Sequence, residues 1–183
     1  MVEINFNPAG EFRGISGNNN LITNPTTLQF GPDGRLYVTE QDGTINAFTI
    51  TRQNGTYTAT AVEEIDLVKI IRNLNDDGSL SNLKDRQVTG LVTAGTATNP
   101  ILYVSSSDPR IAFNRDANLD TNSGVITRLT LGNNGQWEAI DLIRGLPRSE
   151  QSHATNGLTL SPDGSRLYIA QGGNPNNGAP SSL

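Results

Sequence analysis

Residues 28–38 read LQFGPDGRLYV, and residues 158–169 repeat the phrase as LTLSPDGSRLYI. A looser copy lies between them, with GLV at 90–92 and NPILYV at 99–104. The tyrosines that the three copies share stand 66 and then 65 residues apart. A repeat with a fixed period of this size predicts that the chain is built from tandem supersecondary units.

Each unit resolves into short strands joined by tight turns. In the first unit the Pro-Asp-Gly sequence and the Asn54-Gly55 pair are hairpin signals, because each lies between alternating apolar residues. The apolar spacing in residues 64–75 also fits a short helix. The predicted strands are 28–30, 36–40, 44–51 and 57–62, then 88–93, 101–106, 125–131 and 137–142, and finally 157–160 and 167–170.

Four-stranded antiparallel units in tandem predict an all-β fold of the β-propeller type. The chain holds about two and a half blades, with blade 1 at about 24–63, blade 2 at about 86–143 and a partial blade 3 at about 154–183. Because so few blades cannot close a ring, we expect residues 1–183 to be the N-terminal part of a single larger propeller domain, with the missing C-terminal blades as its partner. A β-sandwich of ten short strands is the competing architecture, although a sandwich does not predict the regular period.

Composition excludes several classes of protein. The chain has a net charge of −5 and no cluster of Lys or Arg, which argues against a nucleic-acid partner. No apolar run approaches the roughly 18 residues of a transmembrane helix, so we expect no membrane span. The opening residues MVEINF lack the basic and apolar regions of a signal peptide. The absence of cysteine excludes disulfides, thiolate metal sites and cysteine nucleophiles.

The order of the strands decides which loops share one end of the fold. Neighbouring strands are antiparallel, so the start of the first strand of a unit and the end of its second strand lie together. The segments that lead into the first strands carry Arg86, Gln87 and the only histidine, His153. The long insertion at 107–123 follows a second strand and falls at the same end. We therefore expect the functional site at this mouth of the channel.

A family resemblance rests on residues 142–153, which read LIRGLPRSEQSH, supported by residues 31–34 and 86–91. The pattern continues with Gly157-Leu158, Pro162-Asp163, Leu167-Tyr168 and Gly172-Gly173. It resembles the glucose/sorbosone dehydrogenase-like propellers, the group that contains the soluble PQQ-dependent sugar dehydrogenases. The resemblance implies a six-bladed ring, a periplasmic or extracellular location, and oxidation of a sugar or other alcohol with PQQ as acceptor and calcium as a second cofactor. Because the family's PQQ and calcium ligands come from later blades, no cofactor residue carries over, and we expect this chain alone to be inactive.

The same resemblance assigns candidate catalytic and substrate-binding residues. His153 matches the family's general base, and an imidazole suits proton transfer near neutral pH. The family has an aspartate directly before this histidine, whereas this chain has Ser152, which cannot stabilise an imidazolium as a carboxylate does. Arg86 and Gln87 lie near the family's substrate-side polar position, so together with Ser152 they are the candidate substrate-binding residues. The alternative is that His153 only makes hydrogen bonds in the channel wall.

The 107–123 insertion is a candidate calcium site. It places oxygen ligands at alternate positions, as calcium loops do, and Asp108, Asp116 and Asp120 are the candidate ligands. It lacks the mid-loop glycine and the twelfth-position glutamate of such loops, so a polar loop stiffened by Asx turns is the alternative. A non-catalytic extracellular propeller module that binds a glycan, a peptide or calcium is the functional rival to an enzyme.

Overall fold

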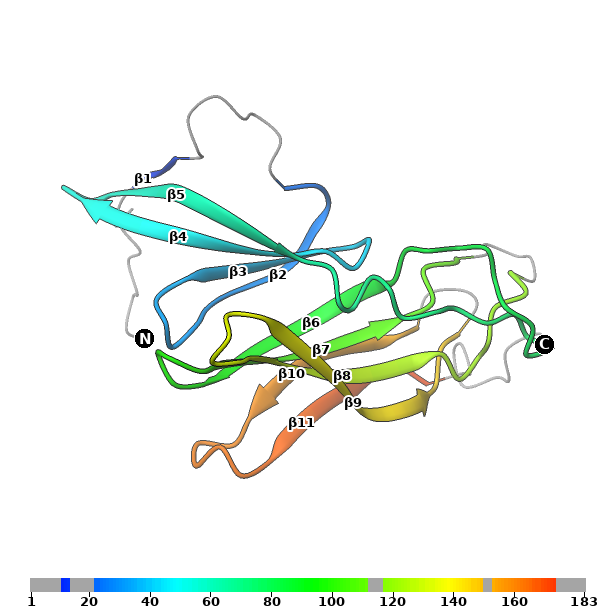
Figure 1. The fold of residues 1–183 in the computed structure, drawn as a ribbon. Helices are drawn as coiled ribbons and strands as arrows, with labels where there is room; N and C mark the ends of the chain where they lie inside the picture. The colour runs from blue at the N-terminus through cyan, green and yellow to red at the C-terminus, as the bar shows by residue number, and fades with distance from the viewer. Residues whose placement is uncertain (1–10, 14–21, 112–116, 150–152, 174–183) are drawn as a thin grey trace, which may run out of the picture.

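The computed structural model describes residues 11–13, 22–111, 117–149 and 153–173, and within these residues the chain is all β (Figure 1). The strands form three sheets. No helix in this described part is long and apolar enough to cross a membrane. The strands are β1 (Glu11–Arg13), β2 (Pro25–Phe30), β3 (Leu36–Glu40), β4 (Ile45–Gln53), β5 (Thr56–Ile65), β6 (Gln87–Gly95), β7 (Pro100–Ser107), β8 (Gly124–Leu131), β9 (Trp137–Leu146), β10 (Thr155–Leu160) and β11 (Leu167–Gln171).

All ten predicted strands are confirmed, since each predicted segment overlaps one of β2 to β11. The short helix considered for residues 64–75 is wrong. The chain continues as strand β5 as far as Ile65, which pairs with Ile45 of β4, and then makes a series of turns. Further on, Asn73 is buried and its side-chain amide donates to the Asp85 carbonyl at 2.7 Å. Cross-strand pairing and this side-chain bond hold the segment in a strand and a loop, despite its helical apolar spacing.

Within each sheet the strands from β2 onward are antiparallel to their neighbours. The first sheet has the order β1-β5-β4-β3-β2, and β1 pairs in parallel with β5 at its outer edge. The second sheet has the order β6-β7-β8-β9, and the third consists of β10 and β11. Asn54 and Gly55 turn β4 into β5 with φ values of 50° and 80°, which are those of the predicted tight hairpin.

Strands β2, β6 and β10 belong to different sheets but lie side by side (Figure 1). Thr27 Oγ1 donates to the Thr89 carbonyl at 3.4 Å, and Thr93 Oγ1 donates to the Phe30 carbonyl at 3.0 Å. The Thr89 hydroxyl in turn donates to the carbonyl of Thr155. These bonds connect successive levels of β2 and β6 in the same order, so both strands run in one direction. In the described part of the chain, bonds that involve side chains join these three strands, and no backbone ladder connects them.

The main core fills the space between the first and second sheets. The exposure of the three repeated tyrosines shows which sheet is packed against a neighbour on its tyrosine side. Tyr37 is 0% exposed, Tyr103 is partly buried and Tyr168 is 52% exposed. The Tyr37 ring meets Trp137 of the second sheet edge-on, with the ring centroids 6.2 Å apart, and its burial raises the pKa of the phenol well above the ordinary value. The second sheet thus covers Tyr37 of the first sheet, whereas Tyr168 of the third sheet is exposed to solvent. Buried members of this core include Ile45, Ala47, Val88, Leu91, Leu102 and Leu129.

Candidate functional site

Several predicted site residues belong to the end of the fold at which β6 and β10 begin. Gly90 of β6 approaches β10 so closely that an added Cβ would lie 2.4 Å from the Asn156 carbonyl oxygen. The residue before Gly90, Thr89, donates to the carbonyl of Thr155, the residue before Asn156. The two strands therefore run in the same direction, and Gln87 at the start of β6 and His153 just before β10 both lie at the end where these strands begin.

Within the described part of the chain, one hydrogen bond holds the ring of His153. Its Nδ1 atom lies 3.0 Å from the carbonyl oxygen of Gly173, which follows β11. A carbonyl can only accept, so Nδ1 donates, and Nε2 keeps its lone pair when the ring is neutral. The side chain is partly exposed, which leaves Nε2 able to take a proton from a bound group. Ser152, the predicted neighbour of His153, lies outside the described residues.

The backbone around His153 is held by Arg148, a residue that sequence reasoning missed. Arg148 is 0% exposed, and its Nη1 donates to the His153 carbonyl at 3.1 Å and also to the Ser149 carbonyl. Its Nε donates to the Asp108 carbonyl at 3.1 Å, and its Nη2 donates to the Arg110 carbonyl at 2.7 Å. Burial lowers the pKa of the Arg148 guanidinium, and the nearby charge of Asp108 opposes this. One cation therefore joins the loop after β7 to the loop before β10.

Arg86, a predicted substrate-binding residue, lies inside the fold. It is 1% exposed, and its Nη1 donates to Asn73 Oδ1 at 2.8 Å, its Nε to Ser106 Oγ at 3.2 Å and its Nη2 to the carbonyl of Ser123. Burial lowers the pKa of the Arg86 guanidinium to about 10, although the charge of Asp108 opposes the shift. All three nitrogens are thus bonded to the protein, and they fasten the loop before β6 to β7 and to the loop before β8.

Gln87, the next residue and the second predicted substrate-binding residue, has a different environment. Its Oε1 atom is buried and accepts no hydrogen bond from any residue that the structure describes, and the hydroxyl of Ser107 likewise has no partner among those residues. These two residues are paired across β6 and β7 at this end of the sheet. Buried polar atoms are seldom left without a partner, so an unpartnered pair on one rung is a plain signal for a bound polar molecule.

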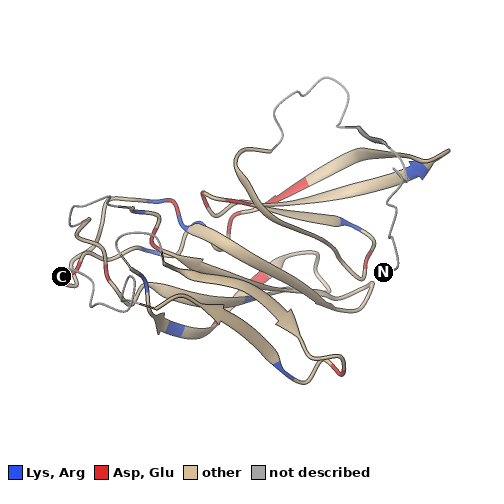
Figure 2. Ribbon diagram, turned by 180° about the vertical axis from the view of Figure 1, so that it is seen from behind, with Lys and Arg blue, Asp and Glu red and all other residues tan. Residues whose placement is uncertain are grey.

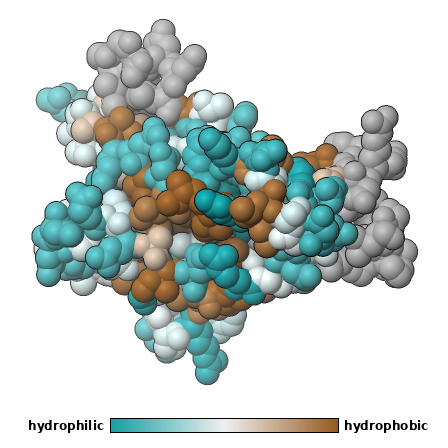
Figure 3. Space-filling model, turned by 45° about the vertical axis from the view of Figure 1, so that its right-hand side comes forward, coloured by the Kyte–Doolittle hydropathy of each residue, from teal (hydrophilic) through white to brown (hydrophobic). Residues whose placement is uncertain are grey.

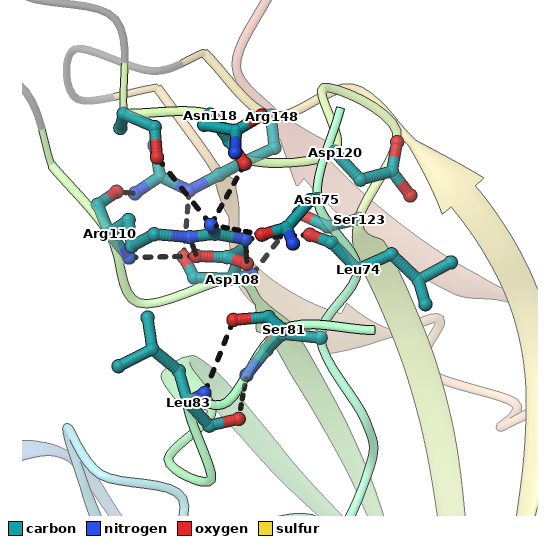
Figure 4. A network of polar contacts seen from close by, with 12 residues as sticks. Leu74, Asn75, Ser81, Leu83, Asp108, Arg110, Asn118, Asp120, Ser123 and Arg148 are labelled. Atoms are coloured by element: carbon teal, nitrogen blue, oxygen red, sulfur yellow. Dashed lines mark hydrogen bonds and ion pairs between the residues drawn. The ribbon is translucent and has the colours of Figure 1, made fainter. Parts of the chain in front are cut away.

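The carboxylate of Asp108, a predicted calcium ligand, is bonded to an arginine (Figure 4). Asp108 is 0% exposed, and its two oxygens lie 3.0 Å from Nε and 2.7 Å from Nη2 of Arg110. Arg110 also donates to the Leu74 carbonyl at 2.6 Å, to Asn75 Oδ1 at 2.8 Å and to the Asn118 carbonyl at 2.8 Å. The pair therefore joins the insertion after β7 to the loop between β5 and β6.

The other two predicted calcium ligands do not join Asp108 in the described part of the chain. Asp120 accepts from the Asn122 N–H at 2.9 Å in an Asx turn, and Figure 4 shows its carboxylate turned away from Asp108. Asp116 lies outside the described residues. Within the described residues no group of three His, Asp or Glu side chains could hold a metal ion. A calcium site that includes Asp116 stays a prediction.

Sequence reasoning missed both Arg110 and Arg148. Their position in the sequence is the signal that could have found them. Each arginine follows a proline in a loop at the predicted site end of the fold, and the chain has only 13 Lys and Arg residues. Their acceptors are mostly backbone carbonyls, which every residue carries, so no pattern of side chains marks them.

Comparison with known proteins assigns no family to this chain. No protein-family model and no curated protein matches its sequence. The chemistry of the site therefore has to be argued from the residues that the fold brings together.

Proposed function

We propose that the three sheets are successive blades of a β-propeller, with β2, β6 and β10 as its innermost strands. The shared direction of β2 and β6 supports this architecture, as does the covering of Tyr37 by the second sheet. Leu28 and Phe30 on β2 are 65% and 51% exposed, and Tyr168 on β11 is 52% exposed. Further blades of a six-bladed ring would pack against these two apolar surfaces.

We propose further that the full-length protein oxidises a sugar or other alcohol at the mouth described above. The observation that carries this proposal is the bond from His153 Nδ1 to the Gly173 carbonyl, because it leaves Nε2 as the proton acceptor. A second observation supports it: Gln87 Oε1 and the Ser107 hydroxyl, which have no partner among the described residues, are paired across β6 and β7 at the same end of the fold. A base at the same end of the fold as unfilled hydrogen-bond positions is what binding and deprotonation of a polyol require.

The roles of the chain's own residues follow from this geometry. His153 Nε2 takes the proton of the hydroxyl that is oxidised, while a neighbouring hydroxyl donates to Gln87 Oε1. The hydride from the carbon that bears the oxidised hydroxyl would pass to a quinone-class acceptor held by residues of further blades. After proton transfer the ring keeps its bond to the Gly173 carbonyl, a neutral acceptor that stabilises the imidazolium less than a carboxylate would. Ser152 in place of an aspartate therefore favours a slow enzyme over a fast one.

The described residues at this end of the fold do not fit PQQ or calcium. PQQ carries carboxylates that call for free cations, yet the guanidinium groups of Arg86, Arg110 and Arg148 are all bonded to protein acceptors. The buried carboxylate of Asp108 is bonded to Arg110. We therefore assign no step to either group, and the proposal places their ligands on further blades.

Substrate binding by this chain can be tested at one nucleus. His153 is the only histidine, so its imidazole Hε1 resonance reports the mouth without ambiguity. We expect D-glucose to shift this resonance in a saturable way, and Gln87→Leu to weaken the binding. Gln53→Leu, at the exposed last position of β4, is the matched control and should leave the binding unchanged. A resonance that no sugar or alcohol moves would contradict the proposed site.

Catalysis is tested in the full-length protein with PQQ and calcium added. Sugar-dependent dye reduction should appear, and His153→Ala should lower it by roughly 10²–10⁴-fold, which is the usual contribution of a general base. Ser152→Asp should raise it, because an adjacent carboxylate stabilises the imidazolium. If sugar binds but no variant reduces the dye, the binding-module alternative, which the serine at position 152 favours, replaces the enzyme.

A further inference from the structure

The row of paired residues that begins with Tyr37 shows how one sheet covers the next. Tyr37 of β3 is paired with Ala47 of β4, which is paired with Glu63 of β5. From the second sheet Trp137, the first residue of β9, meets the Tyr37 ring and donates from Nε1 to Glu63 Oε1 at 3.0 Å. The guanidinium carbon of Arg35 lies 5.2 Å and 5.8 Å from the centroids of these two rings. The outer strand of the second sheet therefore closes the outer half of this interface.

The second sheet carries the equivalent row on the face turned to the third sheet. Tyr103 of β7 is paired with Arg128 of β8, and Arg128 is paired with Ile140 of β9. Ser105, two residues after Tyr103 and so on the same face, donates to the Asn156 carbonyl of β10 at 2.6 Å. The inner part of this face thus meets the third sheet, whereas Ile140 at the outer end of the row is 52% exposed. Open apolar surface is a general feature of this chain, since Figure 3 shows hydrophobic side chains gathered across the middle of one face.

Arg128, in the middle of this row, has no partner in the described part of the chain. Its Nε atom is buried and makes no hydrogen bond with a described residue, and its guanidinium makes no ion pair with one. Glu138, two residues before Ile140 on the same face, is therefore not its counter-charge. Figure 2 shows charged positions mostly in loops and toward the ends of strands, and the neighbouring strands β6, β7, β10 and β11 carry no charged residue. A buried donor left unpartnered in mid-strand indicates that another group lies over it.

The third sheet ends at a free edge in the described part of the chain. It consists there of β10 and β11, whereas each of the other two sheets has at least four strands. A two-stranded unit is marginally stable by itself, and an unpaired edge is a template for another strand. Residues Leu167–Gln171 of β11 include neither a charge nor a proline that would oppose pairing. Because β10 packs against β6 and β7, strands added beyond β11 would continue the sheet over β8 and β9.

We propose that two further strands of the full-length protein continue the third sheet from the edge of β11 and cover the row of Tyr103, Arg128 and Ile140. The outer of these strands places an aromatic residue on Tyr103, as β9 places Trp137 on Tyr37. It also supplies an oxygen acceptor for Arg128 Nε. The occupant is a strand pair because the interface between the first two sheets already forms the same contact. This inference rests on the proposed blade architecture and adds the side chains that join the second blade to the third.

A single introduced thiol reports whether the row is covered. Residues 1–183 contain no cysteine, so Ile140→Cys gives this part of the chain one thiol, whose reaction with N-ethylmaleimide is followed by peptide mass. In the 183-residue chain it should react about as fast as Gln53→Cys, the control at the exposed last position of β4. In the full-length protein the rate at position 140 should fall by about tenfold or more, and the control rate should not change. Adding Arg128→Met should remove about tenfold of this protection, because the cover loses a hydrogen bond to a charged group.

A second thiol separates this inference from the architecture on which it rests. Leu28→Cys lies on β2, a surface against which the proposed ring packs another blade. If Leu28→Cys is protected in the full-length protein and Ile140→Cys is not, the inference is overturned while the propeller stands; if neither is protected, both are overturned. Protection of Ile140→Cys that rises with the concentration of the 183-residue chain would overturn it in favour of a second copy. Equal effects of Arg128→Met and of Arg52→Met, at an exposed arginine of β4, would overturn the role of Arg128.

Discussion

Replacing Arg148 by methionine tests whether one buried guanidinium holds the site end of the fold together. Methionine keeps an apolar stem of similar length but leaves four backbone carbonyls without their donor. A hydrogen bond to a charged group contributes about 1.5–3 kcal/mol, and an orphaned buried acceptor costs about 1–3 kcal/mol. Water replaces part of what is lost, so we expect the free energy of unfolding to fall by about 3–5 kcal/mol, as when one partner of a buried charge is removed. The four carbonyls are those of Asp108, Arg110, Ser149 and His153.

Urea denaturation measures this loss. With a slope of about 2 kcal/mol per molar urea, the midpoint should fall by about 1.5–2.5 M. Arg148→Lys should lie in between, because a single ammonium group cannot reach four carbonyls at once. The Hε1 resonance of His153 should also broaden or shift in the methionine variant, since the His153 carbonyl loses its partner.

The control is Arg166→Met, which removes an exposed arginine from the turn between β10 and β11 and should change stability by no more than about 0.5 kcal/mol. A loss below about 1 kcal/mol for Arg148→Met, or one equal to that of the control, would refute the reasoning that this cation joins the two loops.

Three further predictions address separate features. Gly90→Ala should destabilise the fold by about 1–3 kcal/mol, because its Cβ would meet the Asn156 carbonyl, whereas Gly157→Ala, with open space around it, should not; urea midpoints distinguish them. Burial raises the pKa of Asp33, but the hydrogen bonds from Arg35 and Tyr37 lower it more, so the pKa in the folded state lies below the ordinary value. The stabilisation that Asp33 contributes is therefore present above its ordinary pKa and is lost as the pH falls through the folded-state pKa. Asp33→Asn should therefore reduce stability at neutral pH and shrink the loss between neutral pH and about pH 3, and an unchanged acid loss would count against that bond set. If Asp108, Asp116 and Asp120 hold calcium, millimolar calcium should raise the melting temperature and Asp120→Asn should remove the rise; an unchanged melt leaves Asp108 with Arg110 alone.

The strands could be predicted from the sequence because residues at or next to their ends determine their boundaries. Asn54-Gly55 and the Pro-Asp-Gly turns fix where the chain reverses, and alternation fixes the strands between them. The segment 64–75 could not be predicted this way, because its helical spacing is real but the ladder with β4 extends β5 into it. Tertiary pairing outweighs a weak local preference there.

Strand order predicts that Gln87 and His153 lie at one end of the fold, and β6 and β10, which follow them, run in the same direction in the structure. A functional site at this end stays a prediction, and the bonding of its residues could not be predicted. Arg86 was assigned to substrate by resemblance, yet its three nitrogens are bonded inside the protein. A sequence shows that a guanidinium is present, but whether it faces a ligand or a carbonyl depends on how loops distant in the chain meet.

The unequal burial of the three repeated tyrosines has a consequence for how the molecule opens. Tyr37 is sealed by the second sheet, while Tyr168 has no sheet over it among the described residues. In an array where each unit is stabilised mainly by its neighbour, resistance to local unfolding follows the number of covered faces. Amide hydrogen exchange should therefore be slowest in the second sheet, which has a neighbour on both sides, and fastest in β10 and β11. Opening would begin at that flank and proceed inward sheet by sheet, so the loop that carries His153 would open first.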